Sequence, residues 1–201
     1  MRALLIPLAL AFAAPAFAQG DCAPPAPLAG EDTPLVAFEP EAAVEPALLA
    51  PLAADSPWRA RFEEAADALW PALRSGDAAR WRPMLGGPWL DESAYRAVAA
   101  LLTDRCGAFA PLLAAAAPVE RRIFGWRVPA AYSPAERAEI AARPEAEALA
   151  CWAARDGERA PAWPQTAADA DNGANRPYAC ARIVYSMREG TPRWRAFVER
   201  R

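Results

Sequence analysis

The four cysteines are the residues of this 201-residue chain whose possible chemistry is easiest to judge. Cys22, Cys106, Cys151 and Cys180 lie far apart, so no two of them have the spacing of a zinc knuckle. The chain has no histidine, and all 22 of its basic residues are arginine. A catalytic thiol would therefore lack a histidine base, and no lysine is present to form a Schiff base. We expect no metal site and no cofactor.

The N-terminal residues predict export. A short basic start precedes the apolar run 3–14, and Ala16-Phe17-Ala18 follows as a cleavage site. This order is typical of a signal peptide over residues 1–18 and predicts a periplasmic or secreted protein. The run is short for a membrane span, so no transmembrane segment is expected after cleavage. An N-terminal core helix is a weaker interpretation, as is a lipoprotein anchored at Cys22, because Asp21 replaces the small residue expected there.

An oxidising compartment favours two disulfide bonds over thiol chemistry, and four cysteines allow three pairings. We favour Cys151–Cys180, which would close a polar loop, and Cys22–Cys106, which would join an N-terminal arm to the body. In the chain-entropy model, such a bridge contributes on the order of 3–4 kcal/mol through the unfolded state.

The charge divides the mature chain into an arm, residues 19–55, and a single domain, residues 56–201. The arm has seven acids, seven prolines and no base, whereas residues 176–201 have seven arginines and two acids. Such an arm cannot build its own core. It is either a solvated tether or a strap on the body, held by Cys22 and by the apolar patches 35–38 and 48–52, with the C-terminal hairpin as the docking face. The net charge of −3 argues against nucleic-acid binding.

Helical patterns occupy the first half of the domain. Asp55-Ser56-Pro57 predicts the start of a first helix, and Gly76 its end. Asp77 and Asp91 stand at the cap positions of a second and a third helix. The alanine-rich residues 108–117 predict a further helical piece.

Strand patterns occupy the second half. Residues 178–187 alternate apolar and polar side chains, which is typical of a strand with one buried face. The alternation returns after Glu189-Gly190, so we expect a hairpin with Tyr185 opposite Trp194 and Ile183 opposite Ala196. Two further strands are expected.

These further strands are residues 122–128 and 145–155, the second paired with the hairpin. Its alanines and glutamates also suit a helix. Residues 156–176 are expected to form a long polar loop. The predicted fold is thus α+β, with three N-terminal helices packed on a curved antiparallel sheet of about four strands, preceded by an extended proline-rich arm.

This order of elements resembles the cone-shaped α+β superfamily of nuclear transport factor 2-like, ketosteroid isomerase-like and polyketide cyclase-like proteins. Residues 73–81 and the hairpin segments 183–185 and 193–195 carry the resemblance. It implies a pocket between helices and sheet, in which enzymes of this class hold an acidic base and a tyrosine or acid donor.

No acid of this chain aligns with those roles, so no catalytic residue is assigned. The side chains expected to face the cone interior are Tyr95, Trp126, Tyr185 and Trp194. They are candidate ligand contacts, and their competing role is that of ordinary core residues.

Three classes of function remain. The favoured one is a non-catalytic exported module that binds a small apolar ligand or an envelope protein. The second is an isomerase, cyclase or dehydratase that uses carboxylates and tyrosines in the cone. The third is a structural envelope protein in which the acidic arm and the basic hairpin form contacts. The sequence leaves the oligomeric state open.

Overall fold

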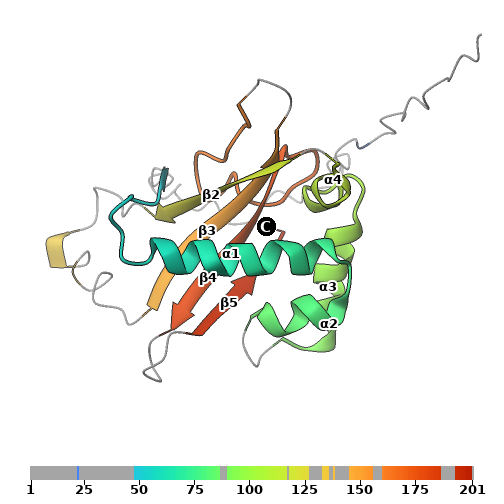
Figure 1. Ribbon diagram of the computed structural model, residues 1–201, viewed down its shortest axis with the longest axis horizontal. Coiled ribbons are helices and arrows are strands. Elements are labelled where there is room, and N and C mark those ends of the chain that lie inside the picture. Colours follow the sequence, from blue (N-terminus) through green and yellow to red (C-terminus); the bar gives the residue numbers. More distant parts are fainter. Residues whose placement is uncertain are drawn as a thin grey trace, which may run out of the picture.

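A five-stranded antiparallel sheet organises the chain (Figure 1). The computed structural model describes residues 22, 48–86, 90–116, 118–126, 133–135, 138, 145–155, 160–186 and 193–200. The strands follow one another in space in their sequence order. They are β1 (Leu49–Pro51), β2 (Val119–Trp126), β3 (Glu145–Ala154), β4 (Tyr178–Ser186) and β5 (Arg193–Phe197). The predicted α+β class is confirmed, but the sheet has five strands rather than about four.

A run of helices lies between β1 and β2 in the chain. They are α1 (Arg59–Arg74), α2 (Ala78–Trp81), the 3-10 helix η1 (Arg82–Met84), α3 (Glu92–Thr103) and α4 (Phe109–Ala114). The alanine-rich piece forms α4, as expected, so this run holds four α-helices where the fold prediction named three. Figure 1 shows α1 crossing the sheet, with α2, α3 and α4 gathered near the C-terminal end of α1.

The predicted helix starts can be compared with the capping hydrogen bonds of the structure. The Oδ1 atoms of Asp77 and Asp91 accept hydrogen bonds from the backbone N–H groups of Ala79 and Ala94, each at 2.9 Å, so both predicted caps are confirmed. The predicted start of α1 was too early. The helix begins at Arg59, and its capping position, Trp58, makes no side-chain cap bond. Ser56 Oγ instead accepts a bond from Trp58 N at 3.3 Å, which forms a turn ahead of the helix.

The pairing of β3, β4 and β5 agrees with the sequence pattern. In the hairpin, Tyr185 lies opposite Trp194 and Ile183 opposite Ala196. Residues 145–154 form a strand rather than a helix, which sets Cys151 opposite Cys180. Burial between β2 and β4 thus overrides the helical propensity of the alanines and glutamates.

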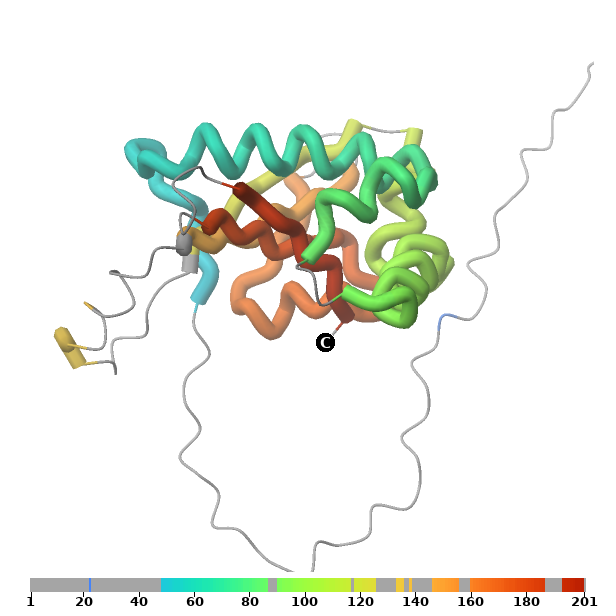
Figure 2. The backbone as a smooth tube through the Cα atoms, turned by 90° about the horizontal axis from the view of Figure 1, so that it is seen from below, coloured from blue at the N-terminus to red at the C-terminus, as the bar shows by residue number. Residues whose placement is uncertain are grey.

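Both faces of the sheet are covered, which differs from the one-sided burial expected. The helices pack on the face that carries Ala148, Trp152, Ala181 and Ile183. The opposite face carries a second buried cluster, made of Phe124, Leu149, Cys151, Ala153, Tyr178 and Cys180. The loop 160–177 lies on this side, away from α1 (Figure 2), and contributes Trp163 and Ala170 to the cluster. The loop predicted to be polar is therefore a structural layer.

Both predicted disulfide bonds are present. Cys22 and Cys106 have their Cα atoms 5.3 Å apart, and Cys151 and Cys180 have theirs 4.1 Å apart. The apolar patch 48–52 lies on the body, since β1 pairs with β2. The patch 35–38 lies outside the described residues. Among the described residues, no helix has the length and apolar character that a membrane crossing requires.

Candidate functional site

Tyr185 and Trp194, two of the predicted ligand contacts, face each other across β4 and β5. Tyr185 is buried, and its hydroxyl donates a hydrogen bond to the backbone oxygen of Arg61 at 2.7 Å. Its ring meets the ring of Phe62 edge to face, with centroids 5.4 Å apart. Burial raises the pKa of the Tyr185 hydroxyl. These contacts make Tyr185 part of the join between α1 and the sheet.

The other two predicted contacts lie elsewhere. Tyr95, on α3, is half-buried beside Trp81, and the Arg82 guanidinium lies 4.8 Å from the centre of its ring. Trp126 ends β2, where its backbone pairs with Leu49, and its side chain lies outside the described part. The structure therefore brings Tyr185 and Trp194 together and places Tyr95 in a separate aromatic group.

Side chains fill the space between α1 and the sheet. Phe62, Leu69 and Leu73 of α1 and Ile183 of β4 are each at most 1% exposed. Next to them, the rings of Trp70 and Trp152 stack with centroids 4.9 Å apart. A close-packed interior of this kind is a core.

The acids near this core have structural partners. Asp67 forms an ion pair with Arg121, and Asp77 caps α2. Asp104 accepts a hydrogen bond from Cys106 N at 3.0 Å and pairs with Arg200 at 3.1 Å. Within the described ranges, no three histidine, cysteine or acidic side chains are grouped in a way that could hold a metal ion.

An apolar groove lies between α3 and the residues that follow β5. Its volume is about 700 Å³. One wall is the face of α3 that carries Ala94, Ala97, Val98, Ala100 and Leu101. Leu90 lies at one end, and the residues that follow β5, Val198 to Arg200, form the other wall. The Asp104–Arg200 ion pair supplies charge at the rim. This groove is the candidate site.

Two anchors fix the helical wall of the groove. Asp91 caps the N-terminus of α3, and its carboxylate pKa is lowered by hydrogen bonds from the Ser93 hydroxyl and the Ala94 N–H. Arg82 donates two hydrogen bonds to the Glu92 carboxylate, at 3.1 and 2.8 Å, which joins η1 to the first turn of α3. Bidentate pairs of this kind restrict orientation as well as distance.

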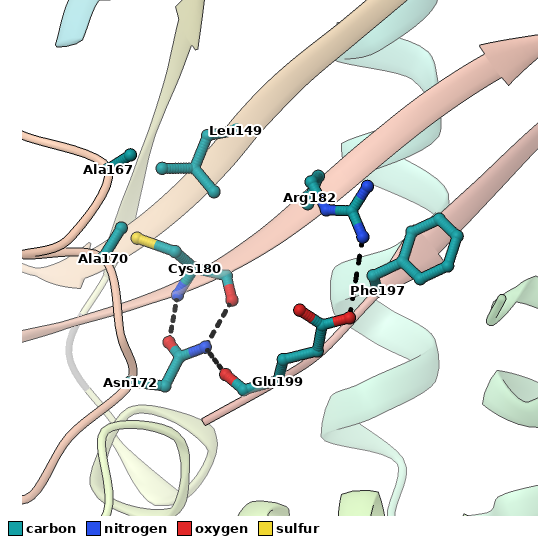
Figure 3. Close-up of a pocket in the computed structure, with 8 residues that line it drawn as sticks. All are labelled: Leu149, Ala167, Ala170, Asn172, Cys180, Arg182, Phe197 and Glu199. Carbon is teal, nitrogen blue, oxygen red and sulfur yellow. Dashed lines mark hydrogen bonds and ion pairs between the residues drawn. The ribbon is translucent and has the colours of Figure 1, made fainter. Parts of the chain in front are cut away.

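Asn172 fixes the second wall, the C-terminal residues 198–200 (Figure 3). Its side-chain oxygen accepts a hydrogen bond from Cys180 N at 2.7 Å. Its amide nitrogen donates to Cys180 O at 2.9 Å and to Glu199 O at 2.6 Å. The side-chain amide of Asn172 thus makes the hydrogen bonds that a backbone peptide group would make between β4 and the end of the chain. Asn172 is 3% exposed and has a positive φ of 54°, a conformation that asparagine tolerates better than most residues.

Two aspartate carboxylates accept hydrogen bonds within the loop that carries Asn172. The pKa of Asp169 is lowered first by the Thr166 backbone N–H and then by the Thr166 hydroxyl. Burial raises the pKa of Asp171, but bonds from the Arg176 guanidinium and the Gly173 N–H outweigh it and lower the pKa. The cavity beside Asn172 measures about 20 Å³, which is room for about one water molecule. A ligand larger than water does not fit there.

The predicted site residues do not include the groove or Asn172. Val98 lies in the third predicted helix, but the groove arises only where the residues after β5 pass that helix. Asn172 carried one local signal, since an asparagine followed by glycine favours positive φ. Comparisons of the chain with protein-family models, with curated proteins and with solved structures give no match.

Proposed function

We propose that this protein is an exported, non-catalytic binding module of the cell envelope, and that the α3 groove binds an apolar helical segment of an envelope protein. The groove is the observation that carries the proposal. It is the large apolar hollow bordering α3, in a body whose helix–sheet interior is filled. The two disulfide bonds and the signal-like residues 1–18 support export.

The form of the groove favours a peptide over a small apolar ligand. Small-molecule sites enclose most of their ligand, whereas this groove runs openly along one helix. Ala94, Ala97 and Ala100 give its wall small side chains, which let another backbone approach closely. Recognition of an amphipathic helix by an apolar groove is a recurrent mode of peptide binding.

The likeness to the cone-shaped superfamily stays a proposal about fold. A helix pair joined at Gly76-Asp77, followed by an antiparallel sheet that ends in a hairpin, supports it. The enzyme alternative requires an open interior with an unengaged acid, and the packed side chains of α1 and β4 weigh against it.

Fluorescence anisotropy tests the proposed function. The probe is a fluorescein-labelled synthetic peptide whose leucines recur at helical spacing, and the comparison is a peptide of the same composition with the leucines scrambled. We expect saturable binding of the patterned peptide. Ala97→Glu places a charge on the exposed groove wall, and we expect it to weaken binding by about tenfold or more, or about 1.4 kcal/mol.

The control variant Thr103→Glu adds the same charge to an exposed position of α3 that does not line the groove. It should bind like the unmodified protein. Equal binding of the patterned and scrambled peptides, or full binding by Ala97→Glu, would overturn the proposal. Binding of anilinonaphthalene sulfonate without peptide binding would favour the small-ligand alternative instead.

A further inference from the structure

We propose that Asn172-Gly173 is a latent deamidation site, which the fold protects, and that its conversion irreversibly loosens the C-terminal wall of the groove. Asn172 and Asn175 are the two asparagines of the chain, and only Asn172 is followed by glycine. Glycine has no side chain to hinder the approach of its nitrogen to the preceding side chain, so this dipeptide cyclises readily.

The reaction needs only water. The Gly173 backbone nitrogen attacks Cγ of Asn172 and loses its proton, the C–N bond of the amide breaks, and ammonia leaves. The product is a five-membered cyclic imide. Water then opens either carbonyl of the ring, which gives aspartate or isoaspartate at position 172. In aspartate the side-chain amide is replaced by a carboxylate, whereas in isoaspartate the backbone runs through the former side-chain carbon and the α-carboxylate is free. No oxidant or reductant takes part.

The native contacts oppose each part of this reaction. The attacking group is occupied, because Gly173 N–H donates a hydrogen bond to Asp171 Oδ1 at 2.9 Å. The Asn172 amide is held by three hydrogen bonds to Cys180 and Glu199. Asn172 is also buried, with 3% of the residue exposed. Ring closure therefore requires that residues 198–200 first separate from the loop, so its rate follows this local opening.

The product cannot restore those contacts. An ionised carboxylate has no N–H to donate, yet it would face the carbonyl oxygens of Cys180 and Glu199 (Figure 3). In the aspartate product, only the bond from Cys180 N would remain. Residues 198–200 would then lose their hydrogen bond to the loop. The wall would be held only by the burial of Val198 and by the ion pairs Arg182–Glu199 and Asp104–Arg200, and it would loosen. The loss of peptide binding that follows rests on the proposed function, whereas the chemical change does not.

The first test measures modification of the full-length, oxidised protein and of the same protein reduced and unfolded in urea. Both are kept in the same mildly alkaline buffer, and peptide mapping by mass spectrometry follows position 172. We expect conversion to be slower in the folded protein by about tenfold or more. Asn175 is an internal control, because it is exposed but followed by the bulky Arg176. Equal rates at Asn172 in both states, or no conversion in the unfolded chain, would overturn the proposal.

The second test uses Asn172→Asp as a mimic of the product and Asn175→Asp as its matched control. Amide hydrogen exchange should become faster at residues 198–200 in Asn172→Asp only. Unchanged protection there would show that Asn172 does not hold the groove wall. Because neither test measures binding, a failure of this inference is distinguishable from a failure of the proposed function.

Discussion

Removing each disulfide bond in turn tests whether loop length or native anchoring decides its contribution to stability. The variants are Cys151→Ala/Cys180→Ala and Cys22→Ala/Cys106→Ala. The bridges span 29 and 84 residues of sequence. On the chain-entropy model alone they contribute about 3.6 and about 4.6 kcal/mol, so the longer loop should matter more.

The structure predicts the reverse order. Cys151 and Cys180 are at most 1% exposed, and the β3–β4 ladder continues on both sides of them. The folded state therefore holds both residues in place without the bridge, and only the unfolded state gains freedom when it is removed. The expected loss is about 3–4 kcal/mol.

Cys22 has a different attachment. Among the described residues, it is joined to the body by its bridge and by one hydrogen bond, from Asn175 Nδ2 to Cys22 O at 2.8 Å. A bond of this kind contributes about 1 kcal/mol, which does not exceed the cost of fixing a residue. Without the bridge, Cys22 leaves the body in the folded state as well. The expected loss for this variant is therefore about 1 kcal/mol or less.

Urea unfolding followed by tryptophan fluorescence measures both losses. The slope of the free energy of unfolding against urea should be checked in each variant, because a changed slope signals a changed unfolded state. A larger loss for Cys22→Ala/Cys106→Ala than for Cys151→Ala/Cys180→Ala would refute the anchoring argument.

Three further predictions concern single side chains. Tyr185→Phe removes the bond to Arg61 O, and we expect a loss of about 1 kcal/mol in urea unfolding. Because burial raises the pKa of Tyr185, the folded state binds more protons than the unfolded state above about pH 10, so stability falls with rising pH there and should fall less in Tyr185→Phe. The pKa of Asp169 is lowered in the folded state, so its contribution to the free energy of unfolding is present above about pH 4 and is lost as the pH falls below that value. Asp169→Asn should therefore flatten an acid-unfolding curve followed by circular dichroism. An unchanged curve would contradict the assignment. Trp152→Ala removes the buried ring stacked on Trp70 and should cost about 3–5 kcal/mol in thermal or urea unfolding, far more than the same change at the half-buried Trp194.

The hairpin was predictable because the residues that determine its register are close together in the sequence. Side-chain alternation fixes which residues of β4 share a face, and a slip of one residue would turn Ile183 and Tyr185 away from the helices. The same register brings Cys180 beside β3, which made the disulfide pairing predictable. The caps at Asp77 and Asp91 were predictable for a similar reason, since the chemistry lies within three residues.

The elements that the sequence did not predict depend on distant contacts. β1 has three residues and ends in proline, so it carries no pattern of its own, and its pairing with β2 makes it a strand. The loop 160–177 reads as polar, yet Trp163 and Asn172 bind it to the second face of the sheet. The α3 groove exists because residues 198–200 pass beside that helix. The periodicity of side chains along α3 does not show which distant residues will pack beside it.

The two disulfide bonds also determine how this protein responds to mechanical force. A force applied between the two ends of the chain passes through each bridge and bypasses the residues that it encloses. The sequence separations of 84 and 29 residues are thus removed from the length that can be extended. α1, α2 and α3 lie inside the longer enclosed segment, so they carry no tension until the bridge is reduced. In the oxidised protein, the residues outside the bridges that can extend are therefore 1–21, those between Cys106 and Cys151, and those beyond Cys180; β2 lies in the second of these segments and β5 in the third.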